Sequence, residues 1–366
     1  MSRPRESHLV PHAAARTILV MAGGTGGHIY PGLAVADELR ERGWKVVWLG
    51  ARAGMEAEIV PAHGYPIQFI RFAGLRGKGF LRMALLPFNL LIAVWQCARV
   101  MFRIRPDVVL GLGGYISFPG GAVAALLARP LVLHEQNSIA GLANKILARL
   151  ASRVLVAFPS ALTKAEWTGN PVRRDIAVLP TPEERFRHRS GNLKLLVVGG
   201  SLGAQALNDA VPKALAMIPA AERPEVTHQS GGRHLEELER GYQAAGVRAN
   251  VAAFIRDMAA AYGSADLVIC RAGALTVSEL AAAGVASVLV PFPQAVDDHQ
   301  THNARFLADR SAAVLLPQNE LTPRRLANLL LGFTRDRLLE MARRARELGK
   351  ADAARVVADH CVAVAG

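Results

Sequence analysis

The feature that most constrains the fold is a glycine-rich turn that occurs twice, each time directly after an apolar, strand-like run. The first turn reads Gly23-Gly24-Thr25-Gly26-Gly27, and the second reads Gly199-Gly200-Ser201-Leu202-Gly203. Glycine permits positive φ angles and a close approach of the backbone, and a helix that follows such a turn presents free N–H groups to an anion. The chain therefore predicts two similar strand–turn–helix units, each able to bind a phosphate or an oxyanion.

Strand-like runs alternate with helical patterns around both turns. This alternation favours βαβ units, so we predict an α/β fold with parallel sheets. The pattern restarts after Pro171, and the sequence Gly169-Asn170-Pro171 marks a hinge between two halves. The runs interpreted as strands are 17–21, 45–49, 107–110, 131–133 and 193–198, and a helix is expected from about 31 to 41.

Length and composition agree with two globular domains in a reducing compartment. The 366 residues exceed the roughly 100–200 of a typical domain. Hydrophobic residues make up 51% of the chain and charged residues 20%, so each half can bury a core. The three cysteines form no CxxC pair, which fits neither a disulfide framework nor a zinc site. A cytoplasmic protein is expected.

Two segments of the sequence decide whether a secretory signal or a transmembrane helix is expected. Residues 1–16 contain no apolar run, so we expect a disordered tail rather than a secretory signal. The longest charge-free apolar stretch runs from Met83 to Ala98 and is shorter than the ~20 residues that cross a bilayer. No transmembrane helix is expected.

Positive charge is concentrated in the first half of the chain. Residues 1–172 hold 19 Lys or Arg and 9 Asp or Glu, whereas residues 173–366 hold 24 and 21. The segment from Ile59 to Pro106 has no acidic residue at all. This segment either faces an anionic partner or merely lacks acids.

An anionic membrane surface fits this segment better than nucleic acid does, because its basic residues bracket an aliphatic run instead of alternating with stacking aromatic residues. The alternative is a buried helix between domains with solvated arginines. The membrane hypothesis places the contact at Arg76, Lys78, Arg82, Leu85, Leu86 and Phe88.

A dinucleotide-dependent dehydrogenase is the first rival for a glycine-rich strand–helix turn. Such an enzyme predicts an acidic residue about 20 positions after the glycines, which holds a ribose. The second strand instead ends Trp48-Leu49-Gly50-Ala51-Arg52. This weakens the rival, although an arginine is compatible with a phosphorylated ribose.

A series of motifs resembles the MurG family of glycosyltransferases, in order over most of the chain. The family resemblance implies a GT-B fold, in which two Rossmann-like domains face each other across a cleft. It implies an acceptor domain at 17–172, completed by a C-terminal helix at 348–366, and a donor domain at 173–347. The motifs are GGTGGHIYPGLAVADEL (23–39), GLRGKG (74–79), PDVVLGLGGYISFPGG (106–121), HEQNSIAGLANK (134–145), GNPVR (169–173), VVGGSLGAQALN (197–208) and GALTVSELAAAG (273–284).

The same resemblance implies the reaction and its setting. The family transfers N-acetylglucosamine from UDP-N-acetylglucosamine to the muramyl sugar of lipid I, which forms lipid II for peptidoglycan. It implies a peripheral protein at the cytoplasmic face of the bacterial inner membrane, in the company of cell-wall synthesis or division proteins. Rival readings are a GT-B transferase with another acceptor, a UDP-sugar epimerase, and a non-catalytic nucleotide-binding membrane protein.

For the donor site, the resemblance implies a nucleotide-sugar segment that ends at Glu279, whose carboxylate can accept hydrogen bonds from both ribose hydroxyls. The spacing from Thr276 to Glu279 also fits a helix capping box, which is the alternative. The donor residues implied are Thr25, Gly26, Gly27, Asn137, Arg173, Ser201, Ile255, Ala274, Leu275, Thr276, Val277, Ser278, Glu279 and Gln300.

A specific role in the donor site is expected for several of these residues. Ser201 is expected near the pyrophosphate, and Arg173 is expected to supply positive charge, with Arg174 as its alternative. Ile255 is expected beside the uracil, unless it is an ordinary core residue. Gln300 is expected at the sugar hydroxyls, a role that His299 could share.

His28 is the candidate general base. Transfer with inversion needs a proton removed from the acceptor hydroxyl, and histidine titrates near neutral pH. A purely structural role in the turn is the alternative for His28, and Glu135 is the alternative base. Tyr115 is expected on the acceptor side of the same cleft.

No metal or cofactor is expected. Asp297, Asp298, His299 and His302 lie close together in the sequence, but their spacing matches no firm ligand motif. GT-B enzymes stabilise the leaving group with helix N-termini and basic residues.

Overall fold

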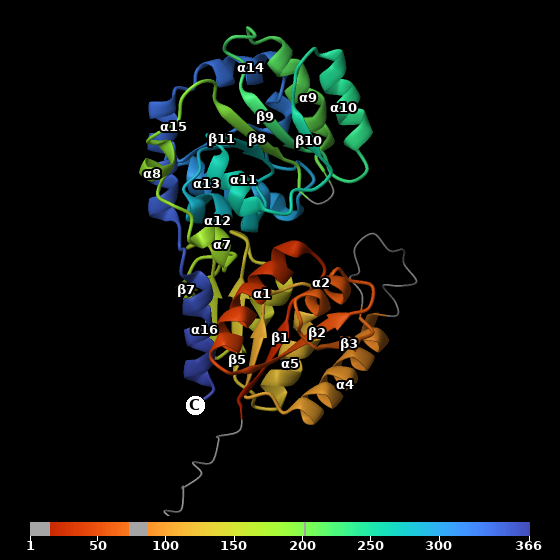
Figure 1. The fold of residues 1–366 in the computed structure, drawn as a ribbon. Helices are drawn as coiled ribbons and strands as arrows, with labels where there is room; N and C mark the ends of the chain where they lie inside the picture. Colours follow the sequence, from red (N-terminus) through yellow and green to blue (C-terminus); the bar gives the residue numbers. More distant parts are fainter. Residues whose placement is uncertain (1–14, 73–85, 201–202) are drawn as a thin grey trace, which may run out of the picture.

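The computed structural model describes residues 15–72, 86–200 and 203–366. They form two α/β domains, one above the other in Figure 1, each built on a parallel sheet. The predicted α/β fold with parallel sheets is therefore confirmed. Residues 1–14 of the expected tail lie outside the described residues, and so do Ser201 and the basic residues Arg76, Lys78 and Arg82.

The N-terminal domain contains a seven-stranded parallel sheet in the order β3-β2-β1-β4-β5-β6-β7. The chain therefore moves outward from β1 to β3, then crosses back and continues from β4 on the other side. The elements are β1 (Thr17–Met21), α1 (Gly26–Glu41), β2 (Lys45–Ala51), α2 (Glu56–Ala62), β3 (Ile67–Ile70), α4 (Leu86–Ile104), β4 (Val108–Gly111), α5 (Ser117–Leu126), β5 (Leu131–Glu135), α6 (Leu142–Leu147), β6 (Arg153–Val156) and β7 (Glu166–Trp167).

The C-terminal domain repeats this topology with a six-stranded parallel sheet in the order β10-β9-β8-β11-β12-β13. The elements are α7 (Arg174–Ala177), α8 (Pro182–Phe186), β8 (Lys194–Val198), α9 (Gln205–Ala216), β9 (Glu225–Gln229), α10 (Leu235–Ala244), β10 (Asn250–Ala252), α11 (Met258–Ser264), β11 (Leu267–Cys270), α12 (Ala274–Ala283), β12 (Ser287–Leu289), the 3₁₀ turn η1 (Val296–Asp298), α13 (His299–Ala308), β13 (Ala313–Leu315), the 3₁₀ turn η2 (Gln318–Glu320), α14 (Pro323–Leu331) and α15 (Arg335–Leu348). A last helix, α16 (Ala353–Val364), follows this domain in the chain.

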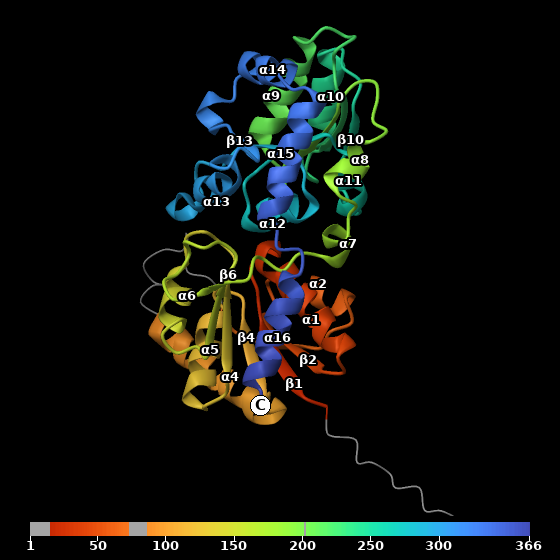
Figure 2. The ribbon, with the colours of Figure 1, turned by 90° about the vertical axis from the view of Figure 1, so that its left-hand side faces the viewer.

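Helices cover both faces of each sheet, which explains why the strands read as continuous apolar runs. In the N-terminal domain, α1, α2 and α16 pack on one face, and α4, α5 and α6 lie on the other. The last helix, α16, thus leaves the C-terminal domain and packs against α1 and β4 beside the first sheet, as Figure 2 shows. The chain therefore crosses between the two domains twice.

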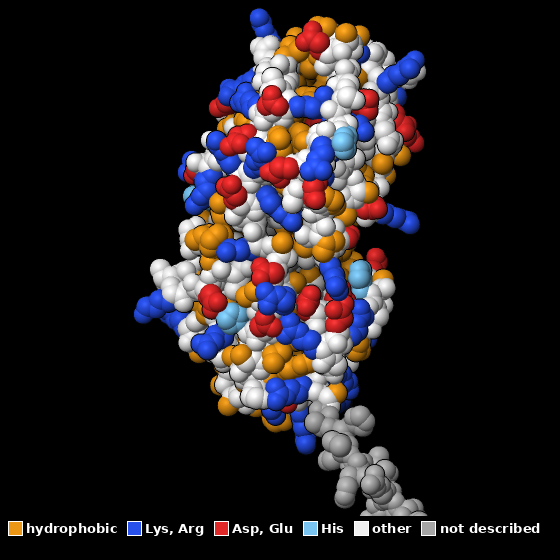
Figure 3. Space-filling model, turned by 60° about the vertical axis from the view of Figure 1, so that its left-hand side comes forward, with side chains coloured by type: hydrophobic (Ala, Val, Ile, Leu, Met, Phe, Trp, Pro, Cys, Tyr) orange, Lys and Arg blue, Asp and Glu red, His pale blue; other side chains and the backbone are white. Residues whose placement is uncertain are grey.

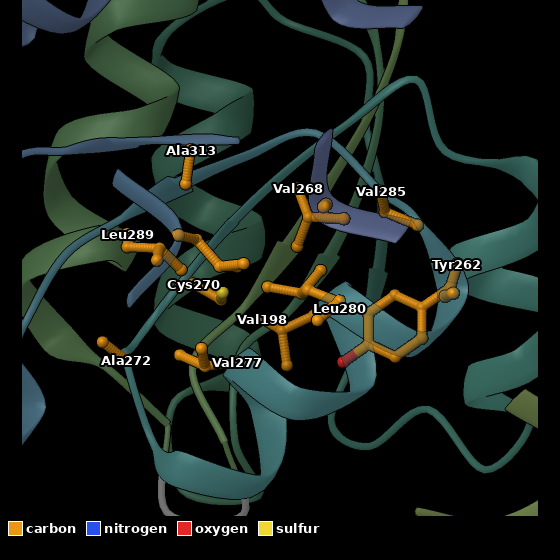
Figure 4. Packing of buried hydrophobic residues seen from close by; sticks show 14 of the residues in the cluster. Val198, Tyr262, Val268, Cys270, Ala272, Val277, Leu280, Val285, Leu289 and Ala313 are labelled. Atoms are coloured by element: carbon orange, nitrogen blue, oxygen red, sulfur yellow. The ribbon is translucent and has the colours of Figure 1, made fainter. Parts of the chain in front are cut away.

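The C-terminal domain has an apolar cluster on each face of its sheet. One cluster, drawn in Figure 4, joins β8, β11 and β12 to α11 and α12, and it contains the fully buried ring of Tyr262. The other joins the sheet to α9, α10 and α14. These clusters fix α12 and Tyr262 relative to the strand ends.

Outside these cores, the face that carries α15 and α16 has intermixed acidic and basic side chains (Figure 3), with surface ion pairs such as Arg343–Glu183 and Arg355–Asp352. Helix α4 differs. It packs on β3 and α5 of its own domain through Ala93, Cys97 and Met101, but its opposite side is exposed. The alternative of a buried interdomain helix is therefore wrong. Among the described residues, no helix is long and apolar enough to cross a membrane.

Candidate active site

Each sheet reverses its strand order at one point, between β1 and β4 in the first domain and between β8 and β11 in the second. Ligands of open α/β sheets bind outside the carboxyl ends of the strands at such switch points. The two glycine-rich turns follow β1 and β8, so each turn lies at the switch point of its own domain. The topology therefore predicts that ligands bind at these two turns.

The first turn is held by a buried carboxylate that the sequence analysis missed. Oε2 of Glu56 accepts a hydrogen bond from the backbone N–H of Gly24 at 3.0 Å, and Oε1 accepts one from Ala51 at 2.9 Å. A Cβ on Gly23 would lie 2.6 Å from Oε1 of the same side chain. The glycine is therefore required for close packing on Glu56. A Cβ on Gly114 would lie 2.4 Å from the carbonyl oxygen of Gly23, so the turn after β4 packs equally closely on the first turn.

His28 lies in the first turn of α1, which begins at Gly26 with Thr25 as its N-cap residue. The Nδ1 atom of its ring lies 2.7 Å from Oε1 of Gln136. Gly113 makes room for the ring, because a Cβ there would lie 3.0 Å from Cε1 of His28. The ring of His28 is thus fixed between the carboxyl ends of β1, β4 and β5.

Behind His28, a buried chain of hydrogen bonds leads to the connection between the domains. Nε2 of Gln136 lies 3.0 Å from Nδ1 of His134 and 3.0 Å from its carbonyl oxygen. Nε2 of His134 lies 2.9 Å from the carbonyl oxygen of Gly169. His134 is fully buried, and burial lowers its pKa to about 4. This imidazole is therefore neutral at physiological pH.

Glu135 has a different environment from that of a general base. Its buried carboxylate accepts hydrogen bonds from the backbone N–H of Asn137 at 2.9 Å and of Gly141 at 3.2 Å. It also accepts from the side-chain amides of Asn137 at 3.3 Å and Asn144 at 2.8 Å. A carboxylate with four donors is committed to the structure of its loop. This geometry favours His28 over Glu135 as the base and places Asn137 on a rigid loop.

Tyr115 belongs to the same side of the site. A Cβ on Gly24 would lie 3.4 Å from Cε1 of Tyr115, so the phenol ring covers the first glycine-rich turn. Burial raises the pKa of Tyr115, and the nearby Glu56 carboxylate raises it further. Tyr115 is therefore a neutral hydrogen-bonding group at the edge of the turn.

In the second domain, Gln229 at the end of β9 joins two of the expected site segments. Its Nε2 donates to the carbonyl oxygen of Gly200 at 3.0 Å, and its Oε1 accepts from the backbone N–H of Ile255 at 3.3 Å. The side chain of Ile255 is partly buried against the domain core. Gln229 was missed by the sequence analysis, and the signal that could have found it is its place at a carboxyl strand end.

Glu279 lies in the second turn of α12 and is nearly buried. Its Oε1 accepts from Nη2 of Arg173 at 3.2 Å, and its Oε2 accepts from the hydroxyl of Tyr262 at 3.2 Å. Burial raises the pKa of Glu279, an effect that Arg173 opposes. The capping-box alternative is wrong, because the N-cap residue of α12 is Gly273 and the carboxylate makes these contacts instead.

Arg173 and its neighbour Arg174 point to different surroundings. The guanidinium of Arg173 lies 5.8 Å from the centre of the Tyr30 ring in α1 and contacts Glu279, so it touches both domains. Arg174 is largely exposed and pairs with Glu41 at 3.0 Å. The geometry therefore favours Arg173 for the donor site.

The two domains also meet through buried polar contacts on the α13 side. Oδ1 of Asn303 accepts from the backbone N–H of Ser138 at 2.9 Å and from its hydroxyl at 2.8 Å. Nearby, Oε1 of Gln300 accepts from the backbone N–H of Phe292 at 2.9 Å. The Asn303 contacts bring α13 to the loop after β5, beside Asn137.

The remaining residues of the expected donor segment form the first turns of α12. The side chains of Ala274 and Val277 are buried in the core, and Ser278 donates to the carbonyl oxygen of Ala274 at 2.9 Å. A ligand could therefore meet Ala274, Leu275, Thr276 and Val277 mainly through the backbone of this helix end. Across residues 15–72, 86–200 and 203–366, no group of three or more His, Cys, Asp or Glu side chains is arranged to hold a metal ion.

Both halves of the chain match glycosyltransferase models. The glycosyltransferase family 28 N-terminal domain matches residues 18–156, and the glycosyltransferase family 28 C-terminal domain matches residues 194–357. The chain is also similar to solved structures. It aligns with the crystal structure of Acinetobacter baumannii MurG with a TM-score of 0.83 at 40% identity, over 95% of this chain and 99% of the other.

Two bacterial relatives are similar over nearly their whole length. A Cupriavidus metallidurans protein is 62% identical over 352 residues, which cover 96% of this chain and 99% of the relative. A Ralstonia nicotianae protein is 61% identical over 353 residues, which cover 96% and 97%. Both are named UDP-N-acetylglucosamine--N-acetylmuramyl-(pentapeptide) pyrophosphoryl-undecaprenol N-acetylglucosamine transferase.

Proposed function

Since the chain belongs to glycosyltransferase family 28, together with the MurG transferases, we propose that it moves N-acetylglucosamine from UDP-N-acetylglucosamine to the muramyl sugar of lipid I and forms lipid II. Membership confirms the predicted GT-B fold, with its two Rossmann-like domains. The transfer inverts the anomeric carbon and makes a β-1,4 linkage. The observation that carries the proposal is that Arg173, in the connection between the domains, contacts Glu279 of α12 and the ring of Tyr30 in α1. The loop after β5 also contacts α13 through Ser138 and Asn303. These contacts support a single site that includes His28 and Glu279.

The C-terminal domain is the donor side of this proposal. Glu279 is a buried carboxylate held by Tyr262 and Arg173, and its oxygens can accept from the ribose diol once Arg173 turns toward the ligand. The side chain of Gln229 ties the second glycine-rich turn to Ile255, the expected neighbour of uracil. Gln300 lies at the start of α13, where it is available to the sugar hydroxyls.

The leaving UDP gains negative charge when the bond from the sugar C1 to the phosphate oxygen breaks. Helix α9 begins at Gln205, just after the second glycine-rich turn, and its N-terminal N–H groups can stabilise that charge. Arg173 adds a guanidinium from the connection between the domains. Ser201, expected in the same place, lies outside the described residues.

His28 is the general base of the proposal. The acceptor hydroxyl attacks the sugar C1 from the side opposite UDP, and its proton passes to the imidazole as the new C–O bond forms. The first glycine-rich turn, with Thr25, Gly26 and Gly27, places the start of α1 beside this ring. Tyr115 covers the turn and is available to the acceptor as a neutral hydroxyl.

The acceptor carries a polyprenyl chain, so the enzyme has to meet it at a membrane surface. Exposure of an apolar chain to water costs about 0.8 kcal/mol per CH₂ group. Helix α4 presents a line of exposed apolar side chains at helical spacing, which we call the α4 face. It consists of Phe88, Leu91, Ile92, Trp95 and Phe102.

Helix α6 and the residues just after it lie on the same side of the sheet as α4, with α5 in contact with both helices. Leu142, Ile146 and Leu150 are exposed there, and residues 136–165 contain no acidic residue. The exposed Lys145 and Arg149 lie among these apolar side chains. Apolar area with adjacent positive charge is what binds an anionic bilayer from one side. Of the contacts predicted from the sequence, only Phe88 falls on described side chains; Arg76, Lys78, Arg82, Leu85 and the side chain of Leu86 lie outside them.

We propose that the protein works at the inner face of the cell membrane. The rivals are transfer to another acceptor, epimerisation of the UDP-sugar and nucleotide binding without catalysis. An assay of UDP release distinguishes these rivals. The full-length chain is incubated with UDP-N-acetylglucosamine, with or without lipid I in anionic vesicles. We expect release that depends on lipid I. Release without it, or no release with it, contradicts the proposal.

A further inference from the structure

The hydrogen bonds behind His28 can be followed atom by atom from the connection between the domains. Nε2 of His134 lies 2.9 Å from the carbonyl oxygen of Gly169. A carbonyl oxygen only accepts, so Nε2 carries the hydrogen. The low pKa that burial gives His134 keeps the ring neutral, and a neutral imidazole has one N–H. Nδ1 of His134 is therefore an acceptor.

This acceptor determines which way the amide of Gln136 is turned. The amide NH₂ group lies 3.0 Å from Nδ1 of His134 and 3.0 Å from its carbonyl oxygen, so each of its two hydrogens has an acceptor. The reversed amide would place its oxygen against a lone pair and a carbonyl oxygen. Gln136 is 1% exposed, so water cannot relieve that repulsion. The amide oxygen must face His28.

The amide oxygen in turn selects the tautomer of His28. Oε1 of Gln136 lies 2.7 Å from Nδ1 of His28, and an amide oxygen only accepts, so Nδ1 carries the hydrogen. In the neutral ring the lone pair is then on Nε2. Among the described residues, the hydrogen bonds of this ring are made at Nδ1 alone. Nε2 is therefore the atom open to an acceptor hydroxyl.

We propose that Gln136 is a positioning residue, oriented by His134, that holds neutral His28 in its Nδ1–H tautomer and so directs the basic Nε2 atom toward the acceptor. The inference rests on the proposed role of His28 as general base. The hydrogen bond made by one ring nitrogen generally decides which nitrogen of a histidine is protonated. Without Gln136, both tautomers and other ring orientations are populated, and only part of the enzyme has its base ready.

The tautomer can be measured directly in the wild-type chain. Full-length protein labelled with ¹⁵N-histidine, examined at pH 7.5 by two-bond proton–nitrogen correlation, separates Nδ1–H from Nε2–H rings. Spectra of His28→Ala and His134→Phe assign the two signals. We expect His28 as Nδ1–H and His134 as Nε2–H. The opposite tautomer at His28 overturns the proposal without any need for a variant at Gln136.

Gln136→Met keeps the length of the side chain and removes the amide. We expect the ¹⁵N shifts of His28 to move toward those of a tautomer mixture, and kcat to fall roughly 10- to 100-fold, less than for complete loss of a general base. KM for UDP-N-acetylglucosamine should stay within about twofold, since Ile255 and Glu279, the expected contacts of the nucleotide, lie in the other domain. Gln68→Met, in β3, is the matched control and should keep wild-type kcat. Unchanged His28 shifts in Gln136→Met contradict the proposal, as does an equal loss of kcat in Gln68→Met.

The two claims fail in different ways. If His28→Ala has wild-type turnover, His28 is not the general base, and its tautomer has no role in catalysis. If His28→Ala is inactive but Gln136→Met has wild-type kcat, the base stands and the positioning role of Gln136 is wrong.

Discussion

The guanidinium of Arg173 lies 3.2 Å from the carboxylate of Glu279, 106 residues further along the chain. This ion pair joins the connection between the domains to α12, the helix of the proposed donor site. Its carboxylate end is nearly buried, while its arginine end is partly exposed. The arginine can therefore turn toward a phosphate while the carboxylate stays in place through Tyr262.

Glu279→Ala should weaken UDP binding by about 1–3 kcal/mol, the range for loss of a hydrogen bond to a charged group. The two-domain fold should persist, because Glu279 lies at the edge of the core. Titration calorimetry with UDP measures the change. Glu183→Ala is the control, since Glu183 pairs with Arg343 on the surface of the same domain. Unchanged UDP affinity in Glu279→Ala would remove this residue from the donor site.

His28→Ala should lower turnover by at least ~100-fold while UDP still binds, as expected for loss of general-base assistance. His63→Ala is the matched control, because His63 is an exposed histidine of the same domain. Turnover with lipid I and UDP affinity are measured on both variants. Near-wild-type turnover of His28→Ala would leave this histidine with a structural role only.

The α4 face should supply a salt-resistant part of membrane binding. Phe88→Ser combined with Trp95→Ser removes two side chains whose full burial would contribute about 1.5–3 kcal/mol each. Sedimentation with anionic vesicles should show weaker binding, and lipid I turnover should fall, while transfer to a short-chain soluble acceptor survives. Met217→Ser combined with Leu331→Ser removes exposed apolar side chains from the other domain and should bind vesicles as the wild type does.

The basic residues of α6 and of the turn after it, Lys145 and Arg149, should supply the salt-sensitive part. Lys145→Glu combined with Arg149→Glu removes two charges worth about 1 kcal/mol each near anionic lipid, and high salt should mimic this loss in the wild type. Full vesicle binding after the apolar and the basic changes together would show that this surface is not the membrane contact. Equal loss of activity with the soluble acceptor would show that the changes disturb the site itself.

Acid should destabilise the fold through two buried histidines. Burial lowers the pKa of His134 to about 4 and that of His228 to about 3, from 6.5 in an exposed chain. Between each folded-state pKa and 6.5, the histidine binds a proton in the unfolded chain but not in the folded one. The free energy of unfolding is therefore highest above pH 6.5 and decreases as the pH falls below it. Each histidine contributes up to about 1.4 kcal/mol per pH unit.

His228→Gln tests this pH dependence, because an amide can still pair with the hydroxyl of Tyr242 but does not titrate. Urea midpoints at pH 7.5 and pH 5 should differ less in this variant than in the wild type. His188→Gln, an exposed histidine in the same domain, should keep the wild-type difference. The same difference in all three proteins would mean that His228 is not responsible.

Much of the fold was predictable from the sequence, because buried parallel strands are apolar runs bounded by glycine. The strand predicted at 17–21 matches β1, and β2 extends the one predicted at 45–49 by two residues. Helix α1 was predicted to start near Pro31, because proline is common at the first position of a helix, but it begins at Gly26. The N–H groups of His28 and Ile29 already bond to the carbonyl oxygen of Thr25 and start the helix there.

The candidate site was predictable only where a residue belongs to a local motif. His28 and Glu279 stand in glycine-rich or helix-start motifs, and the structure brings their two domains together. Glu56, Gln136 and Gln229 were missed because their partners are far away in the sequence: Gln136 contacts a residue 108 positions distant. Glu135 became a candidate base because its type and position suit that role. Only the folded loop shows that four donors occupy its carboxylate.

The proposed reaction is measured by the transfer of labelled N-acetylglucosamine from the UDP-sugar to synthetic lipid I in anionic vesicles. We expect a lipid-linked disaccharide with a β-1,4 bond and one UDP released per sugar transferred. Formation should be lost in His28→Ala and retained in His63→Ala. Free N-acetylglucosamine, an epimerised UDP-sugar or an unmodified lipid I in the presence of folded, UDP-binding enzyme would contradict it.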